Sequence, residues 1–116
     1  MANVLGTARY KNVKLDLTTV SATIVYTCPA LMNTVVESIL VSEDSGNATT
    51  ITVTITNSGS VFNLYKDKSI SAKGTSELLT NSLILVPGDI LKVTAGVANR
   101  LHVVSSIVEV PKSTTA

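Results

Sequence analysis

Cysteine, histidine and tryptophan are almost missing from this sequence of 116 residues, which contains Cys28, His102 and no tryptophan. A single cysteine excludes an internal disulfide framework and fits a protein made in a reducing cytoplasm. With one cysteine and one histidine, a zinc site would need carboxylates from scattered loops, and no tetrahedral ligand spacing is present. We therefore expect no metal and no cofactor.

Charge is also scarce, because Lys, Arg, Asp and Glu make up only 15% of the chain and the net charge is +1. The lysines are dispersed, so the sequence shows no basic footprint for a nucleic-acid partner. No apolar run approaches the roughly 18 residues of a membrane helix, and no secretory leader is visible. We expect a soluble protein with no nucleic-acid partner and no membrane partner.

Apolar residues, in contrast, make up 45% of the chain. A chain of this length forms one domain and can bury a real core. The apolar surplus favours a homo-oligomer in which a partner subunit covers part of the surface. A core rich in Val and Ile would give the same composition, so this alternative stays open.

Alternation of apolar and hydroxyl side chains is the strongest pattern in the sequence. Ile51, Val53 and Ile55 alternate with threonines, which predicts a half-buried strand. Val, Ile and Thr make up 40 of the 116 residues, and their branched side chains suit a pleated sheet. Strands are predicted near residues 4–9, 13–18, 22–28, 35–43, 49–56, 61–66, 76–79, 83–86, 90–95 and 101–110.

Glycine-containing turns divide these strands. Gly46, Gly59, Gly74 and Gly88 each follow or precede polar residues in a short segment between two predicted strands. We expect each of the four glycines at a position that tolerates positive φ.

Two predicted strands are apolar on both faces. The run from Val35 to Val41 is interrupted only by Glu37 and Ser38. Such strands suit the middle of a sheet covered on both sides, or a sheet whose outer face meets another subunit. In the last strand, one face carries His102, Val104, Ser106, Val108 and Val110, and the other carries Leu101, Val103, Ser105, Ile107 and Glu109.

About eight short strands without a helix predict an all-β fold, an antiparallel β-sandwich that is either jelly-roll-like or immunoglobulin-like. The jelly roll is favoured because the paired cysteines and tryptophan of immunoglobulin domains are absent. Residues 1–110 are expected to form the single sandwich domain. Residues 111–116 are expected to form a flexible C-terminal tail.

Candidates for catalysis are few. The apolar strand neighbours of His102 favour a packed or interface histidine over a catalytic base. Their separation in the sequence does not exclude a pairing of Cys28 with His102 in the folded protein, but nothing around Cys28 resembles a cysteine-protease signature. The loop from Glu43 to Asn47 offers oxygen ligands for calcium, yet it lacks EF-hand spacing and is predicted to be a solvated turn. We assign no catalytic, cofactor-binding or metal-binding residue and predict that the protein is not an enzyme.

The acidic side chains stand in no recognisable pairing for glycoside hydrolysis, and we expect them on the solvated surface. Asp89, in the turn Pro87-Gly88-Asp89, is expected to accept backbone N–H bonds within its turn. The acidic residues are Asp16, Glu37, Glu43, Asp44, Asp67, Glu77, Asp89 and Glu109.

Aromatic platforms for glycans or single-stranded nucleic acid are limited to three tyrosines and one phenylalanine. Phe62 and Tyr65 have opposite parity, so we expect them on opposite sides of one strand, with one of them in the core. A glycan-binding loop that uses Tyr65 or Tyr10 stays open.

Two short motifs give this chain a resemblance to a known group of proteins. The first is Tyr26-Thr27-Cys28-Pro29-Ala30, and the second is Leu85-Val86-Pro87-Gly88-Asp89-Ile90-Leu91. Over roughly residues 22–110 the sequence resembles small structural proteins of tailed bacteriophages, in which such motifs frame a β-sandwich. Where members of that group have valine before the first proline, this chain has Cys28.

The resemblance implies a virion component made in the host cytoplasm. We expect a capsid decoration or cement protein, hypothetically a homotrimer, that binds the major capsid protein and uses residues 2–9 or 111–116 as arms to its neighbours. The alternative is a tail, neck or fibre component involved in assembly or in binding a host-receptor glycan, and an enzyme is the third reading. Both motifs are scaffold motifs, so they assign no binding residue.

Overall fold

Nine β-strands and their connecting turns make up the described part of the protein. The computed structural model describes residues 8–112, and none of these residues form a helix long and apolar enough to cross a membrane. The strands are β1 (Arg9–Leu17), β2 (Thr23–Thr27), β3 (Met32–Glu43), β4 (Thr49–Asn57), β5 (Ser60–Ile70), β6 (Thr75–Glu77), β7 (Leu83–Leu85), β8 (Ile90–Ala95) and β9 (Leu101–Pro111).

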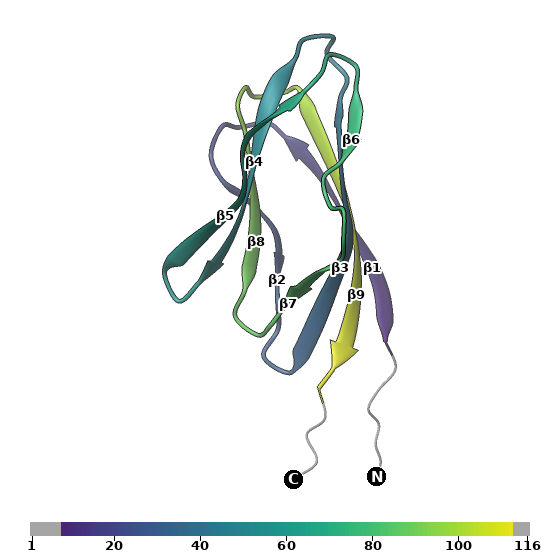
Figure 1. Cartoon of the computed structure of the whole chain (residues 1–116), viewed down its shortest axis with the longest axis vertical. Coiled ribbons are helices and arrows are strands. Elements are labelled where there is room, and N and C mark those ends of the chain that lie inside the picture. The colour runs from purple at the N-terminus through teal and green to yellow at the C-terminus, as the bar shows by residue number, and fades with distance from the viewer. Residues whose placement is uncertain (1–7, 113–116) are drawn as a thin grey trace.

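The strands form two antiparallel sheets that face each other (Figure 1). Sheet A has the strand order β1-β9-β3-β6, and β7 pairs with another part of the same edge of β3. Sheet B has the order β2-β8-β4-β5. When β6 and β7 are taken as one interrupted strand, these are the two four-stranded sheets of a jelly roll. The predicted all-β sandwich is therefore confirmed.

The predicted break between the first two strands is wrong. β1 is continuous, and it pairs with β9 from Arg9, opposite Glu109, to Leu17, opposite Leu101. The polar residues of this stretch suggested a loop, but β1 is the edge strand of sheet A, where exposed polar side chains are tolerated. Residues 4–7 of the predicted 4–9 strand lie outside the described residues. The other predicted strands are present, with ends shifted by a few residues.

A bulge at Glu37 explains why the apolar pattern of β3 is interrupted. β3 pairs with β9 up to Val36 and again from Ser38, so Glu37 has no partner in the ladder. One extra residue reverses the alternation of side chains, and Val36 and Ile39 therefore both point inward with 0% exposure.

Three of the four turn glycines adopt positive φ as predicted, namely Gly46 at 90°, Gly59 at 83° and Gly88 at 91°. Between β4 and β5, Ser58 also has positive φ, at 51°. Two consecutive residues of this kind form the tight type I′ turn whose twist matches that of the flanking strands.

The prediction for Gly74 is wrong, because its neighbour Lys73 adopts the positive φ, at 55°. Gly74 is required for space instead. A Cβ at this position would lie 2.4 Å from Ser71 Oγ and 3.1 Å from the Ser71 carbonyl oxygen.

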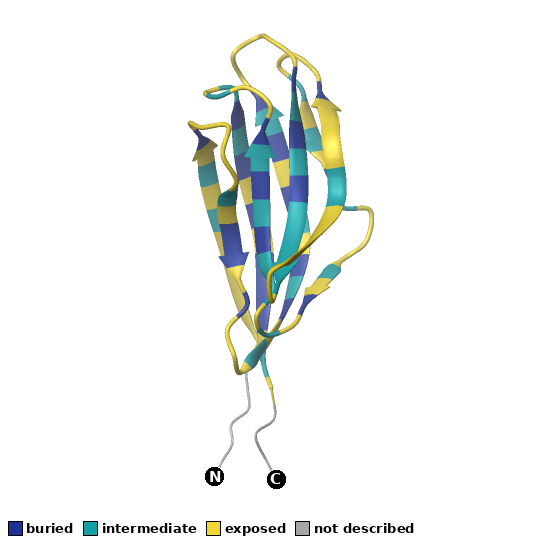
Figure 2. Cartoon of the chain, turned by 90° about the vertical axis from the view of Figure 1, so that its left-hand side faces the viewer, coloured by how far each residue is buried: buried dark blue, intermediate teal, exposed yellow. Residues whose placement is uncertain are grey.

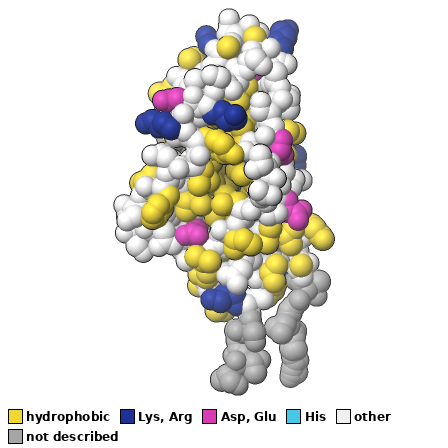
Figure 3. Space-filling model, viewed as in Figure 1, with side chains coloured by type: hydrophobic (Ala, Val, Ile, Leu, Met, Phe, Trp, Pro, Cys, Tyr) yellow, Lys and Arg dark blue, Asp and Glu magenta, His cyan; other side chains and the backbone are white. Residues whose placement is uncertain are grey.

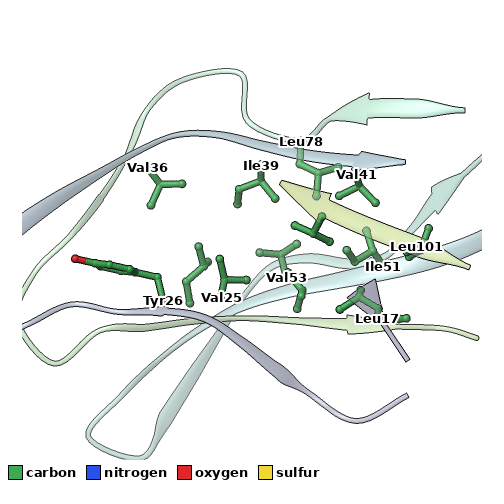
Figure 4. Packing of buried hydrophobic residues seen from close by; sticks show 14 of the residues in the cluster. Leu17, Val25, Tyr26, Val36, Ile39, Val41, Ile51, Val53, Leu78 and Leu101 are labelled. Atoms are coloured by element: carbon green, nitrogen blue, oxygen red, sulfur yellow. The ribbon is translucent and has the colours of Figure 1, made fainter. Parts of the chain in front are cut away.

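The core fills the space between the two sheets, and Figure 4 shows its aliphatic side chains pointing toward one another. In β4, Ile51 and Val53 are completely buried, as the alternation predicted. Burying a side chain of this size contributes roughly 1.5–3 kcal/mol. The residues labelled in Figure 4 are Leu17, Val25, Tyr26, Val36, Ile39, Val41, Ile51, Val53, Leu78 and Leu101.

Candidate assembly surface

Cys28 and His102 lie near opposite ends of the sandwich. Cys28 is 2% exposed, and its Sγ lies 3.5 Å from the Thr34 hydroxyl. His102 pairs with Ser42, which is further along the same strand β3. The eight residue steps from Thr34 to Ser42 span about 25 Å of strand. The structure therefore does not bring the thiol and the imidazole together.

His102 is half-exposed on the outer face of sheet A, between two carboxylates. Its Nε2 lies 3.4 Å from Asp16 Oδ1, and its Nδ1 lies 3.6 Å from Asp44 Oδ2. Because the carboxylates flank opposite nitrogens of the ring, they cannot join the imidazole in holding one metal ion. Within residues 8–112, no three His, Cys, Asp or Glu side chains form a group that could hold a metal.

The acidic loop after β3 is a turn organised by one buried carboxylate. Glu43 is 2% exposed and accepts hydrogen bonds from the N–H groups of Ser45 (2.8 Å), Gly46 (3.0 Å) and Lys73 (2.9 Å). Desolvation alone would raise the pKa of Glu43, but these bonds and one from the Ser45 hydroxyl outweigh it and lower the pKa to about 2. The carboxylate oxygens bind this loop and the turn between β5 and β6. The expectation that Glu43 is solvated is wrong.

Glu109 is also buried, at 5% exposure, and the expectation that it lies on the solvated surface is wrong. Its Oε2 accepts a hydrogen bond from the Tyr26 hydroxyl and lies 3.5 Å from Lys11 Nζ. Burial of the phenol, followed by its bond to Glu109, raises the pKa of Tyr26 to about 12. Tyr26 is 8% exposed, so the pair leaves no room for a substrate. The pair joins β2 of sheet B to β9 of sheet A.

Asp89 accepts hydrogen bonds within its own turn, as predicted, since its Oδ2 lies 2.9 Å from the Val86 N–H. The same turn contacts the first sequence motif. The N–H of Cys28 donates to the Asp89 carbonyl (2.9 Å), and the N–H of Gly88 donates to the Cys28 carbonyl (3.1 Å). The two motifs that carry the bacteriophage resemblance therefore form one structural unit.

Phe62 and Tyr65 lie on the same side of β5, contrary to the prediction. Phe62 pairs with Ile55 and Tyr65 pairs with Val53, and these two partners share the inner face of β4. Leu64 is the extra residue of a bulge between them, and it cancels the difference in parity. Phe62 is nevertheless 57% exposed, because the β4–β5 hairpin projects from the body of the sandwich (Figure 1).

Tyr65 is a packing residue and its ring is not an open glycan platform. Its hydroxyl donates to the Leu78 carbonyl, and the Lys68 ammonium lies 5.7 Å from the ring centroid. Apolar side chains are visible along the side of the sandwich that Figure 3 shows. A hollow of about 240 Å³ is lined by Leu64, Tyr65, Leu79, Thr80, Asn81, Ser82 and Leu83.

The outer faces of the two sheets differ in chemistry. The outer face of sheet B (Figure 2) carries the threonines of β4 together with Lys92 and Thr94 of β8. The outer face of sheet A, which we call the sheet A face, carries aliphatic side chains among polar ones at its centre, where β9 and β3 lie side by side. Val104 is 36% exposed there and Leu40 is 39% exposed.

Cross-strand pairing arranges the sheet A face in rows. Tyr10 and Ile84, at the two ends of one row, are 82% and 58% exposed. Read from β1 through β9 and β3 to the outermost strand, the rows are Tyr10, Val108, Val35 and Ile84; Asn12, Ser106 and Ser38; Lys14, Val104, Leu40 and Glu77; and Asp16, His102, Ser42 and Thr75. The alternation in the sequence predicted which residues of β9 share a face. The rows depend on the register between strands, which the sequence could not predict.

No protein-family model and no curated protein matches this sequence. Solved structures are similar to it. A chain of the Bacillus endospore appendages, described as disulfide-linked pili, is 15% identical with a TM-score of 0.58, over 97% of this chain and 96% of that one. A pentameric capsid protein from metagenomic phage sequences is 19% identical with a TM-score of 0.49, over 89% of this chain and 62% of that one. At 15% identity the likeness to the appendage chain is one of fold.

Proposed function

We propose that this protein is a non-enzymatic structural component of a bacteriophage virion, and that it is a capsid decoration or cement protein which stabilises the head lattice. The observation that carries the proposal is the difference between its two outer faces. One face is rich in hydroxyl groups, whereas the other presents one apolar row and the aliphatic pair of Val104 and Leu40, which are suited to contact with protein.

Two further observations support this function. The motifs that resemble phage structural proteins are joined by backbone hydrogen bonds between Cys28 and the turn Gly88-Asp89. In addition, the two buried carboxylates have structural partners: Glu43 accepts a hydrogen bond from the Ser45 N–H in its loop, and Glu109 accepts one from the Tyr26 hydroxyl. A building block needs this rigidity and no reaction centre. Residues 2–9 and 111–116 were predicted to be arms to neighbouring subunits. Arg9 and Pro111 belong to strands, and for residues 2–7 and 113–116 the arms stay a prediction.

A subunit of a tail, neck or fibre is the second candidate function. The likeness to a Bacillus appendage protein, which covers both chains almost completely, favours a filament subunit. A disulfide-linked filament does not fit, because Cys28 is the chain's single cysteine and is buried. Electron microscopy of the purified protein distinguishes the two, since a filament subunit forms fibres and a decoration protein forms discrete oligomers.

Removing the protein from phage heads tests the cement function. Heads that lack it should release DNA at a lower temperature than complete heads, and addition of the purified protein should restore their resistance. Protein denatured before addition is the control. Heads that are equally stable with and without the protein would contradict the proposal.

A further inference from the structure

The sheet A face has the arrangement expected of one half of a symmetric contact. Its central strands β9 and β3 contribute Val104, Val35 and Leu40, which are exposed or half-buried, and Val108, which is 9% exposed, while its outer strands contribute the charges Lys14 and Glu77. Aliphatic residues at the centre of a face and charged residues at its margin are the usual anatomy of a protein interface. The equivalent centre of sheet B is occupied by threonines.

We propose that the sheet A face binds the same face of a second copy of this protein, around a two-fold axis that runs parallel to the strands between β9 and β3. The inference rests on the proposed function, because it names the partner of the sheet A face that this function uses for assembly. It commits to a two-fold contact and thereby replaces the trimer hypothesised from the sequence.

Rotation about this axis leaves each row at the same position along the strands and reverses its order across the sheet. Each row of one copy therefore lies opposite the same row of the second copy, running in the reverse direction. Tyr10 then faces Ile84 of the second copy, and Val108 faces the second copy's Val35. In the third row, Val104 faces the second copy's Leu40. In these two rows each apolar residue therefore meets another apolar residue, as in the aligned packing of two sheets, whereas Val110, which pairs with Asn33, meets the second copy's Asn33. A contact of this isologous kind closes on itself and forms a dimer.

The charges on the face are complementary under the same rotation. Lys14 faces Glu77 of the second copy at both margins of the contact. Glu77 accepts hydrogen bonds from the Ile39 N–H (2.8 Å) and the Ser38 hydroxyl, so its carboxylate is held in place on the outer face. The bulge residue Glu37 faces Ser106 of the second copy, whose hydroxyl is able to donate to it.

The remaining charged row also avoids repulsion. Asp16 faces Thr75 of the second copy, and His102 faces the second copy's Ser42. No two groups of like charge are opposite each other in the four rows. This self-complementarity depends on the observed register, because a shift of one residue would replace the outward side chains with the core side chains.

The face is large enough for a stable dimer. Four strand positions at about 4.8 Å spacing and nine residues at about 3.3 Å rise give a flat area of roughly 600 Å². With side chains included, this approaches the roughly 800 Å² per partner of a standard interface.

Native mass spectrometry of the purified full-length protein tests the contact. The wild-type protein should be a dimer. Val104→Asp should weaken the dimer by more than about 100-fold, because it buries an unpaired carboxylate at the centre of the contact. Thr94→Asp, which adds the same charge to the outer face of sheet B, is the matched control and should leave the dimer intact. A wild-type monomer or trimer, or equal effects of both variants, would overturn the proposal.

Cross-linking tests the geometry without a disruptive variant. Tyr10→Cys protein mixed with Ile84→Cys protein should be joined by a bismaleimide shorter than three strand spacings, about 14 Å. Neither variant alone should be joined, because equivalent residues lie on opposite margins of the dimer. Wild-type protein is the control for Cys28, which is buried. Cross-linking of a single variant alone, or none in the mixture, would refute the two-fold arrangement.

The two proposals fail in different experiments. A protein that is absent from phage heads but forms this dimer refutes the virion function and leaves the contact standing. A protein that stabilises heads but is not a dimer refutes the contact alone.

Discussion

At the scale of single residues, two buried carboxylates hold parts of the sandwich together. Glu109 accepts a hydrogen bond from the Tyr26 hydroxyl and so connects the two sheets. Glu43 accepts bonds from two backbone N–H groups of the β3–β4 loop and from one of the β5–β6 turn, and so holds these two turns together. Buried charges persist when such partners satisfy them. Removing a partner should therefore cost more than the loss of an ordinary surface bond.

Replacing Tyr26 with phenylalanine is expected to destabilise the protein by about 1.5–3 kcal/mol, because the buried Glu109 carboxylate loses a charged hydrogen bond. Urea unfolding followed by circular dichroism measures this change. Tyr10→Phe, at a position that is 82% exposed, is the control and should change the free energy of unfolding by less than about 0.5 kcal/mol. Equal stability of the two variants would contradict a structural role for the Tyr26–Glu109 bond.

Acid should remove the contribution of Glu43 to stability. The pKa of Glu43 is lowered from its ordinary value of 4.5 to about 2 in the folded protein, so the unfolded chain binds the proton first as the pH falls. Its contribution is then complete above pH 4.5 and is lost between pH 4.5 and about 2. The urea midpoint of Glu43→Gln should lie below that of the wild type at neutral pH and converge with it near pH 2. Glu37→Gln, on the surface, is the control, and a constant gap at all pH values would contradict the prediction.

At the scale of elements, turn geometry and bulges set the register that creates the sheet A face. The β4–β5 hairpin turns through Ser58 and Gly59, which both have positive φ. The bulge at Glu37 keeps both ends of β3 in contact with the core and leaves Val35 and Leu40 outside. Small changes in these places reposition many side chains at once.

Gly59→Ala is expected to cost about 1–2 kcal/mol, which is the price of a left-handed conformation for a residue with a Cβ. No atom lies within 4 Å of the site of that Cβ, so the cost arises from the backbone alone. Gly59→Asn should cost less, because asparagine tolerates this conformation. Thermal unfolding of both variants measures the difference, and an alanine variant as stable as the asparagine variant would contradict it.

Local patterns predicted most strands, but not the features that depend on distant partners. The alternation in β4 was sufficient to predict which residues face the core, whereas in β9 it only divided the side chains into two largely apolar sets. Nothing in the sequence near Glu37 or Leu64 distinguishes a bulge from a regular strand, because a bulge is defined by the facing strand. Glu109 shared its parity with core residues, which was a usable signal for burial. Its partner Tyr26 is on the other sheet, so the sequence could not predict that the two residues form a hydrogen bond.

At the scale of the whole molecule, the jelly roll gives a rigid body with two unlike outer faces. The aliphatic and charged rows of the sheet A face are displayed by four neighbouring strands, and they are self-complementary under a two-fold rotation. Because this contact occupies the sheet A face, the contacts with a head lattice that the proposed function requires have to come from other surfaces of the dimer. Together these features describe a building block that acts through its surfaces.

The copy number of this protein in purified phage particles tests the central claim most directly. Gel densitometry against the major capsid protein should give a number of copies of the same order as that protein, because a cement protein occupies repeated positions on the head lattice. Absence from the particles, or a few copies per particle as in a neck or fibre, would contradict the account.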